Sequence, residues 1–537
     1  MTEASRQHPA FFTAGSLLFI TPLCVLGAII GTQLITTLGV NPNTALIGAL
    51  GGMALGRIPL AAFRQYRSIH MQNLAQSAIS AATFGAGNAL LLPIGIPFLM
   101  GMPELVLPLL LGVFLAMLVD GYLLYRMFDS EAFPASGAWP PGVAAAEAIK
   151  AGDAGGHRLV VLGGGVLAGV VGEALFAIPM SAFGIAFIGN IWALAMFGVG
   201  LLVRSYSQLL FGGPAFASIF PGGDISKAYL PQGFMIGAGL VALIQVVILV
   251  MKGGRGAGAA AASRGAPYVR RTLGLGSGLY ILIAIMLAAF GGLFTSLSPG
   301  MLIGFLIYAA FAALAHEIIV GLAAMHAGWF PAFGVAVVTL GVGILLGFPP
   351  VALTLLVGFT AATGPAFADM GYDLRAGYML RGYGADPAFE LEGRKQQLYA
   401  AMFAFVVSGV MVFLSHKFYF AANMVAPIDR AYVASIKAGA SIEIARDLAI
   451  WAIPGALVQL AGGSKRQMGI LFATGLLIGN PLAGWAVLVG IALRYVWTRV
   501  TAGTRQSDME VFAAGVIAGD AFYSFWDMGS RYFAAKK

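Results

Sequence analysis

The stretch HMQNLAQSAISAATFGAGNALLLP places carboxamide and hydroxyl side chains inside otherwise apolar sequence. Gln72, Gln76 and Ser80 recur every four residues with Asn73 beside them, so a helix would gather them on one side. An amide presents both a donor and an acceptor, which suits binding of a peptide backbone. Hydrogen bonding between packed helices is the alternative. We favour a solute-lining helix, to which Asn88 also belongs.

Several ionisable residues could also do chemistry. Asp369 and Asp373 follow a break predicted at Gly364-Pro365, within the segment 365–378 that ends at Tyr378. Asp520 lies deep in another apolar run, where a charge is costly and functional by default. A buried carboxylate whose pKa moves toward neutrality can carry a coupling proton. We therefore predict Asp373 and Tyr378 as substrate-binding residues, and Asp369 and Asp520 as proton-coupling residues. An ordinary loop with an internal ion pair to Arg375 remains the alternative for 365–378.

Glu147 and Lys150 lie three residues apart after the helix-breaking sequence Pro140-Pro141-Gly142. A helix that starts here at membrane depth would point free N–H groups at an anionic group of a substrate. We predict both side chains as substrate-binding and Glu147 also as proton-coupling. The alternative is a surface helix whose two charges pair with each other.

A metalloprotease motif is incomplete in this chain. Intramembrane zinc proteases use His-Glu-x-x-His, in which two histidines one helical turn apart flank a general base. His316-Glu317 is followed by Val320 where the second histidine should stand, and His326 is poorly spaced. A buried polar pair or a proton relay fits His316-Glu317 better. We expect no metal, no cofactor and no enzymatic activity.

The composition is that of a polytopic helical membrane protein. Of the 537 residues, 59% are hydrophobic and only 10% are charged, whereas soluble domains contain about 25% charged residues. The mean hydropathy is +0.88. Apolar segments of 18 or more residues recur along the chain, each long enough to cross a bilayer as a helix. About 16 transmembrane or half-helices are expected if each needs about 20 residues.

Basic residues cluster between the spans, so the net charge of +8 does not indicate a nucleic-acid partner. The linker 252–272 contains five basic residues and no acidic one, which predicts a cytoplasmic position. The same rule, applied to the other basic turns and the C-terminal tail, predicts that both termini are cytoplasmic. The linker separates two predicted transmembrane units, 1–251 and 273–537.

The two units resemble each other. AEAIKAGD recurs as VASIKAGA, which aligns Lys150 with Lys437, and two further pairs of segments follow in the same order. An even number of spans in each unit would give two repeats in parallel orientation, as some secondary transporters have. Chance similarity among Gly/Ala-rich helices is the alternative, and we favour duplication.

Five segments, taken in order, resemble the oligopeptide transporter family and its prokaryotic branch. They are QNLAQSAISA, PPGVAAAEAIKAGDAGG, FADMGYDLRAGYMLRG, the run RQMGILFATGLLIGNPLAGWAVLVGIALR, and FAAGVIAGDAF. Pro141, Ala145 and Arg375-Ala376 depart from the family's Glu, Cys and Lys-Thr. If the missing glutamate handles protons or amines in relatives, this chain must do so elsewhere.

The resemblance implies a multi-pass symporter in the inner (plasma) membrane that uses the proton gradient to import small peptides, peptide-like compounds or metal chelates. It also implies about 16 helices in two eight-helix repeats, with cargo between them. A passive channel and an intramembrane enzyme remain alternative classes. The resemblance specifies neither the substrate nor the coupling stoichiometry, and it is compatible with a homo-oligomer.

Overall fold

The computed structural model describes residues 8–39, 65–152, 157–253, 264–327 and 332–534. Before the linker the helices are α1 (Ala14–Thr37), α3 (Ile69–Phe84), the π-helix η2 (Gly85–Leu91), α4 (Leu92–Leu99), α5 (Val106–Met127), α6 (Pro140–Gly152), α7 (His157–Phe176), α8 (Met180–Ile188), α9 (Ile191–Ser205), α10 (Ser207–Phe211) and α11 (Leu230–Gly253). Single 3₁₀ turns are η3 (Pro103–Leu105), η4 (Pro214–Phe216) and η5 (Pro221–Gly223). The span expected at 43–62 lies outside the described residues.

After the linker the helices are α12 (Ala266–Phe290), α13 (Leu293–Ser296), α14 (Pro299–Ala327), α15 (Ala332–Leu345), α16 (Pro350–Ala362), α17 (Pro365–Leu380), α18 (Pro387–Ala421), α19 (Asp429–Ala438), α20 (Ile442–Arg466), α21 (Met468–Leu477), α22 (Pro481–Val500) and α23 (Gln506–Ala534). Across the described ranges, nine helices are long and apolar enough to cross a membrane, and five shorter helices are also apolar. The prediction of an all-α polytopic membrane protein is confirmed. The figure of about 16 helices remains a prediction.

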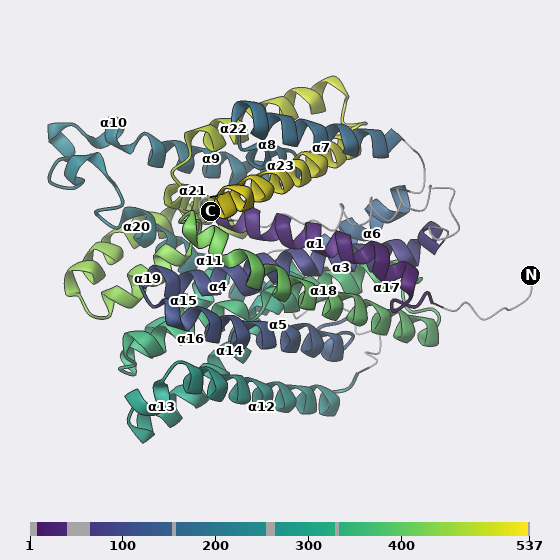
Figure 1. The fold of residues 1–537 in the computed structure, drawn as a ribbon, viewed down its shortest axis with the longest axis horizontal. Coiled ribbons are helices and arrows are strands. Elements are labelled where there is room, and N and C mark those ends of the chain that lie inside the picture. The colour runs from purple at the N-terminus through teal and green to yellow at the C-terminus, as the bar shows by residue number, and fades with distance from the viewer. Residues whose placement is uncertain (1–7, 40–64, 153–156, 254–263, 328–331, 535–537) are drawn as a thin grey trace, which may run out of the picture.

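Two composite spans form the centre of the molecule. Both Ile69–Leu99 (α3, η2 and α4) and Pro350–Leu380 (α16 and α17) are 94% buried over their apolar windows, against 17% for Ile442–Gly463. Figure 1 shows α3, α17 and α18 between α12 on one side of the body and α7, α22 and α23 on the other. Helices that face lipid keep apolar side chains exposed, so the two buried composite spans are the ones placed to hold polar groups away from lipid.

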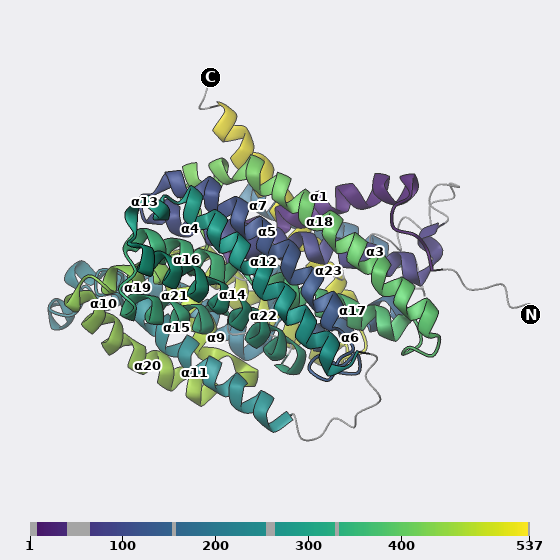
Figure 2. The ribbon, with the colours of Figure 1, turned by 90° about the horizontal axis from the view of Figure 1, so that it is seen from below.

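Helices from before and after the linker pack on each other in reciprocal pairs. The most extensive helix contacts are those of α7 with α23 and of α11 with α20. A Cβ atom at Gly169 of α7 would overlap the Val516 carbonyl of α23, and one at Gly455 of α20 would overlap the Phe234 carbonyl of α11. Small residues let membrane helices approach this closely. The chain is therefore one interlocked body, which Figure 2 shows from a second direction.

The second composite span is broken in its middle. α16 ends at Ala362 and α17 begins at Pro365, and the intervening Gly364 has φ +98°. Only glycine adopts this backbone conformation without strain. The break predicted from Gly364-Pro365 is present, and it places Asp369 and Asp373 on the helix that follows.

We expect Gly364→Ala to lower the free energy of unfolding by about 1–3 kcal/mol, because a residue with a side chain is strained at this φ. Its Cβ would also lie 2.9 Å from the Val320 Cβ. Thermal unfolding of the purified protein in detergent measures the effect. The matched control is Gly278→Ala in α12, where nothing lies within 4 Å of the added carbon. Equal melting temperatures for the two variants would contradict the assigned strain.

Candidate functional site

The side chains of Gln72, Asn73, Gln76 and Ser80, here called the amide stripe of α3, face α17 and α18, not lipid. Gln72, Asn73, Gln76 and Ser80 are each at most 3% exposed. The Asn73 amide donates to Gln76 Oε1 at 2.8 Å, and Gln76 Nε2 donates to Asp373 Oδ1 at 2.5 Å. One turn further, Ser80 Oγ donates to Asp369 Oδ1 at 2.6 Å. Gln76 and Ser80 are four residues apart on α3, as Asp369 and Asp373 are on α17. The two spacings match, so each polar group of α3 meets one carboxyl group of α17.

Both carboxyl groups are deeply buried and only partly satisfied. Asp369 is 1% exposed and Asp373 is fully buried. The second oxygen of each, Oδ2, has no hydrogen-bond partner among the described residues. Nor does either group form an ion pair within the described ranges; Arg375 instead donates to the Ala135 carbonyl at 2.6 Å. The internal ion pair considered for 365–378 is therefore absent from the described ranges. A buried carboxylate is costly unless paired, so each of these oxygens can accept a proton or a hydrogen bond.

Gln397 of α18, which the sequence analysis missed, closes this interface. Its amide donates to Ser77 Oγ at 3.0 Å and to the Asp373 carbonyl at 2.6 Å, while its Oε1 accepts from Arg381 at 2.8 Å. Its separation from Ser77 by 320 residues left no local signal. One side chain thus connects α3, α17 and the loop that follows α17.

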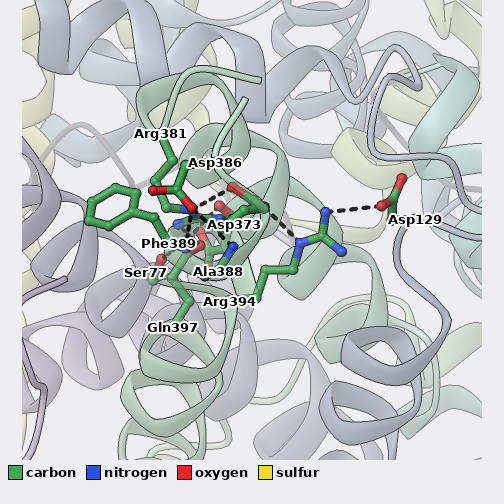
Figure 3. Close-up of polar contacts among 10 residues, drawn as sticks. Ser77, Asp129, Asp373, Arg381, Asp386, Ala388, Phe389, Arg394 and Gln397 are labelled. Carbon is green, nitrogen blue, oxygen red and sulfur yellow. Dashed lines mark hydrogen bonds and ion pairs between the residues drawn. The ribbon is translucent and has the colours of Figure 1, made fainter. Parts of the chain in front are cut away.

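Beyond Gln397 lies a buried ion-pair network (Figure 3). Glu390 accepts from Arg381 Nε and from Arg394 Nε, both at 2.7 Å. Arg394 also pairs with Asp129 at 3.2 Å. The i,i+4 spacing of Glu390 and Arg394 is a local signal for their pair, whereas no local pattern indicates the pairs with Arg381 and Asp129. The network fixes the end of α17 against the start of α18 and so holds the α17 carboxyl groups in register with α3.

The remaining predicted residues lie apart from the α3–α17 contact. Glu147 and Lys150 form an ion pair of 3.1 Å on α6, with side chains 59% and 39% exposed. This is the self-paired alternative, although α6 does begin at Pro140 and its first turn packs on the Tyr372 carbonyl of α17. Asp520 of α23 is 5% exposed and accepts from the Ser181 amide at 2.8 Å.

Asn88 and Tyr378 flank the contact. Asn88 lies half-buried in the π-helix η2, a distortion often found at functional sites. Tyr378 is half-buried at the far end of α17, where the Arg375 guanidinium lies 5.7 Å from its ring centre.

A family model of OPT oligopeptide transporter proteins matches residues 13–256 and 268–528, which is nearly the whole chain. The chain belongs to the OPT oligopeptide transporter family. It is thus a multi-pass membrane protein of a transporter family, and that family is not a class of enzymes. No match was found among curated proteins. The family predicted from the five sequence segments is confirmed.

Proposed function

We propose that this OPT-family chain is a proton-coupled symporter that imports small oligopeptides or peptide-like compounds, metal chelates included, across the inner (plasma) membrane. One observation carries the proposal. The amides of α3, which precede the linker, meet the carboxyl groups of α17, which follow it, at a buried contact. In transporters built from repeats, cargo binds between the repeats near mid-membrane.

Each polar group at this contact has a role in the proposal. Asp373 accepts a charge-assisted hydrogen bond from a cationic group of the cargo, such as a peptide ammonium. Gln76, Asn73 and Gln72, with Asn88 and Tyr378, bind its backbone amides. In the described state Asn73, Gln76 and Asp373 bond to one another, so we take this state as closed. Opening of the α3–α17 contact exchanges those bonds for bonds to cargo.

Asp369 is the proposed carrier of the coupling proton at this site. Its Oδ1 accepts from Ser80, and its Oδ2 is left for a proton. Protonation removes the charge that makes burial costly, so proton uptake favours a state in which Asp369 is buried together with the cargo. Asp520 and Glu147 stay secondary candidates. Asp520 accepts from the Ser181 amide of α8, whereas the exposed Glu147–Lys150 pair suits a contact at the mouth of the pathway.

The two transmembrane repeats are proposed to be 1–251 and 273–537. The reciprocal packing of α7 on α23 and of α11 on α20 supports this division, since aligning Lys150 with Lys437 makes α7 equivalent to α20 and α11 equivalent to α23. In this alignment α7 and α20 are one element of the repeat, and α11 and α23 are another. Both pairs are then contacts between these two elements, and in each pair one helix comes from each repeat. Rocking of one repeat against the other would alternate access to the cargo site.

We place the N-terminus on the cytoplasmic side with the basic linker. In Figure 1, α1 and α23 run in the same direction along the body, and α23 ends far from the start of α1. The basic tail had predicted a cytoplasmic C-terminus. If the N-terminus is cytoplasmic, the shared direction of α1 and α23 does not favour that prediction. We therefore leave the C-terminus out of the proposal.

Uptake by proteoliposomes tests the proposal. A gradient of one pH unit corresponds to about 1.4 kcal/mol per proton, so one coupled proton supports about tenfold accumulation of a neutral probe. Radiolabelled trialanine and glutathione serve as probes. Accumulation only under an imposed proton gradient supports symport. Flux that merely equilibrates the probe indicates the alternative, a passive channel.

We expect Gln76→Leu to lose probe uptake while the protein still inserts into the membrane. Leucine has about the volume of glutamine but leaves Asp373 without its amide donor. An unsatisfied buried acceptor costs about 1–3 kcal/mol of free energy. Initial uptake rates, normalised to reconstituted protein, measure the effect. Gln506→Leu, at an exposed position of α23, is the control. Unchanged uptake by Gln76→Leu would assign the stripe to packing alone.

A further inference from the structure

Three acidic side chains outside the α3–α17 contact meet in the protein interior: Asp120 of α5, Tyr280 of α12 and Glu317 of α14. All three are fully buried. The Tyr280 hydroxyl lies 2.6 Å from Asp120 Oδ1 and 3.0 Å from Glu317 Oε2. None of the three forms an ion pair within the described part of the chain. Buried charges without a counter-ion are unfavourable, and membrane proteins retain them mainly for function.

Counting donors assigns the protons in this triad. A phenol carries one proton and can donate one hydrogen bond, so it cannot donate to both carboxyl groups. Asp120 already accepts at both oxygens, from Tyr280 and, at 2.6 Å, from the Gly364 amide. Glu317 Oε1 has no partner among the described residues. Asp120 is therefore the carboxylate, and Glu317 is the carboxylic acid whose proton donates to the Tyr280 oxygen.

The triad also holds the break between α16 and α17. The Gly364 amide that donates to Asp120 is the residue with φ +98° at this break. Next to it, the Thr363 carbonyl lies 2.7 Å from His316 Nδ1, and the Thr363 hydroxyl donates to the Ala313 carbonyl at 3.0 Å. α5 and α14 thus fix both residues of the break through polar groups. A hydrogen bond to a carboxylate is about twice as strong as one to a neutral acid, so proton uptake on Asp120 would weaken the hold on Gly364.

From this geometry we infer that Asp120, Tyr280 and Glu317 form a second proton-binding site, whose protonation releases the α16–α17 break and so moves the helix that carries Asp369 and Asp373. The inference rests on the proposed proton coupling. Glu317 passes its proton to the Tyr280 oxygen as the Tyr280 hydroxyl proton passes to Asp120. One proton is transferred, and the charge moves from Asp120 to Glu317. A second proton, taken up on Glu317, leaves the triad neutral.

The titratable neighbours of this site are few. On α14, His316 precedes Glu317, and its ring nitrogens face the Thr363 and Ala332 carbonyl oxygens at 2.7 and 3.0 Å. On α17, Asp369 and Tyr372 follow the break, and Asp369 bonds to Ser80 on its other side. α12 contributes Tyr280 itself. A neutral imidazole donates from only one nitrogen, whereas both nitrogens of His316 face acceptors. His316 can therefore also bind a proton.

Infrared difference spectra between the wild type and each variant, purified in lipid nanodiscs without any peptide, test the proton assignment. We expect the wild type to show a protonated-carboxyl C=O band at neutral pH, Glu317→Gln to lack it, and Tyr280→Phe to shift it. The control Glu104→Gln removes an exposed carboxyl group in the turn before α5 and should leave the band in place. A band that persists unshifted in both Glu317→Gln and Tyr280→Phe would overturn the inference.

A transport measurement separates this inference from the proposed function. Asp120→Asn and Glu317→Gln should still exchange labelled for unlabelled trialanine, while proton-driven accumulation falls from about tenfold per pH unit to about one. Accumulation at the wild-type level in either variant would overturn the inference. If the wild type accumulates no probe, the proposed function fails, and the infrared result alone decides whether the triad holds a proton. Retained exchange in a variant shows that its loss of accumulation is not one of folding.

Discussion

Replacing Asp373 by asparagine is expected to raise the apparent KM for a peptide probe with a free ammonium group by about ten- to a hundredfold. Asparagine keeps the shape of the side chain but removes its negative charge, which is proposed to bind the cargo ammonium. A hydrogen bond to a charged group contributes about 1.5–3 kcal/mol. Initial rates of trialanine uptake over a range of concentrations, in proteoliposomes at fixed pH, measure the change.

The control for this prediction is Asp447→Asn. Asp447 pairs with exposed Arg446 on α20, and the loss of such a surface pair is expected to change binding little. A KM for Asp373→Asn equal to that of the wild type, with the protein correctly inserted, would remove Asp373 from the cargo site.

Replacing Glu390 by alanine is expected to lower the free energy of unfolding by about 3–5 kcal/mol. The change leaves Arg381 and Arg394, which are 6% and 2% exposed, without the carboxylate they share. Removing one partner of a buried ion pair is strongly destabilising because the other charge stays buried. Thermal unfolding in detergent, followed by size-exclusion of the heated samples, measures the loss.

Glu392→Ala is the matched control on the same helix. Glu392 pairs with Lys395 at 3.6 Å, and both side chains are nearly half exposed, so this pair should contribute less than about 1 kcal/mol. The network at Glu390 stabilises the fold only if its variant melts well below the control. Similar melting temperatures for the two variants would contradict that assignment.

The sequence predicted the elements of the site better than their pairing. Gln72, Gln76 and Ser80 do share one face of α3, because helical spacing depends on local sequence alone. Gly364-Pro365 does break a span, because backbone limits at glycine and proline are also local. The composition predicted a polytopic helical protein, since only helices and closed barrels satisfy the backbone in lipid.

The contacts between distant helices could not be predicted in this way. Gln397 joins Ser77 across 320 residues, and Asp120 meets Tyr280 across 160. Asp120 and Glu317 are charges within apolar runs, but local sequence pairs Glu317 only with His316 and connects neither carboxyl group to Tyr280. Which buried groups meet depends on tertiary packing, and no periodic pattern in one helix specifies its neighbour.

The central claim is that cargo binds where α3 meets α17. The most direct measurement is a cryo-electron microscopy map of the full chain in lipid nanodiscs with saturating trialanine. We predict density for the peptide between α3 and α17, in contact with Gln76 and Asp373 and with their mutual hydrogen bond broken. Peptide density elsewhere, with the Gln76–Asp373 bond intact, would contradict the account.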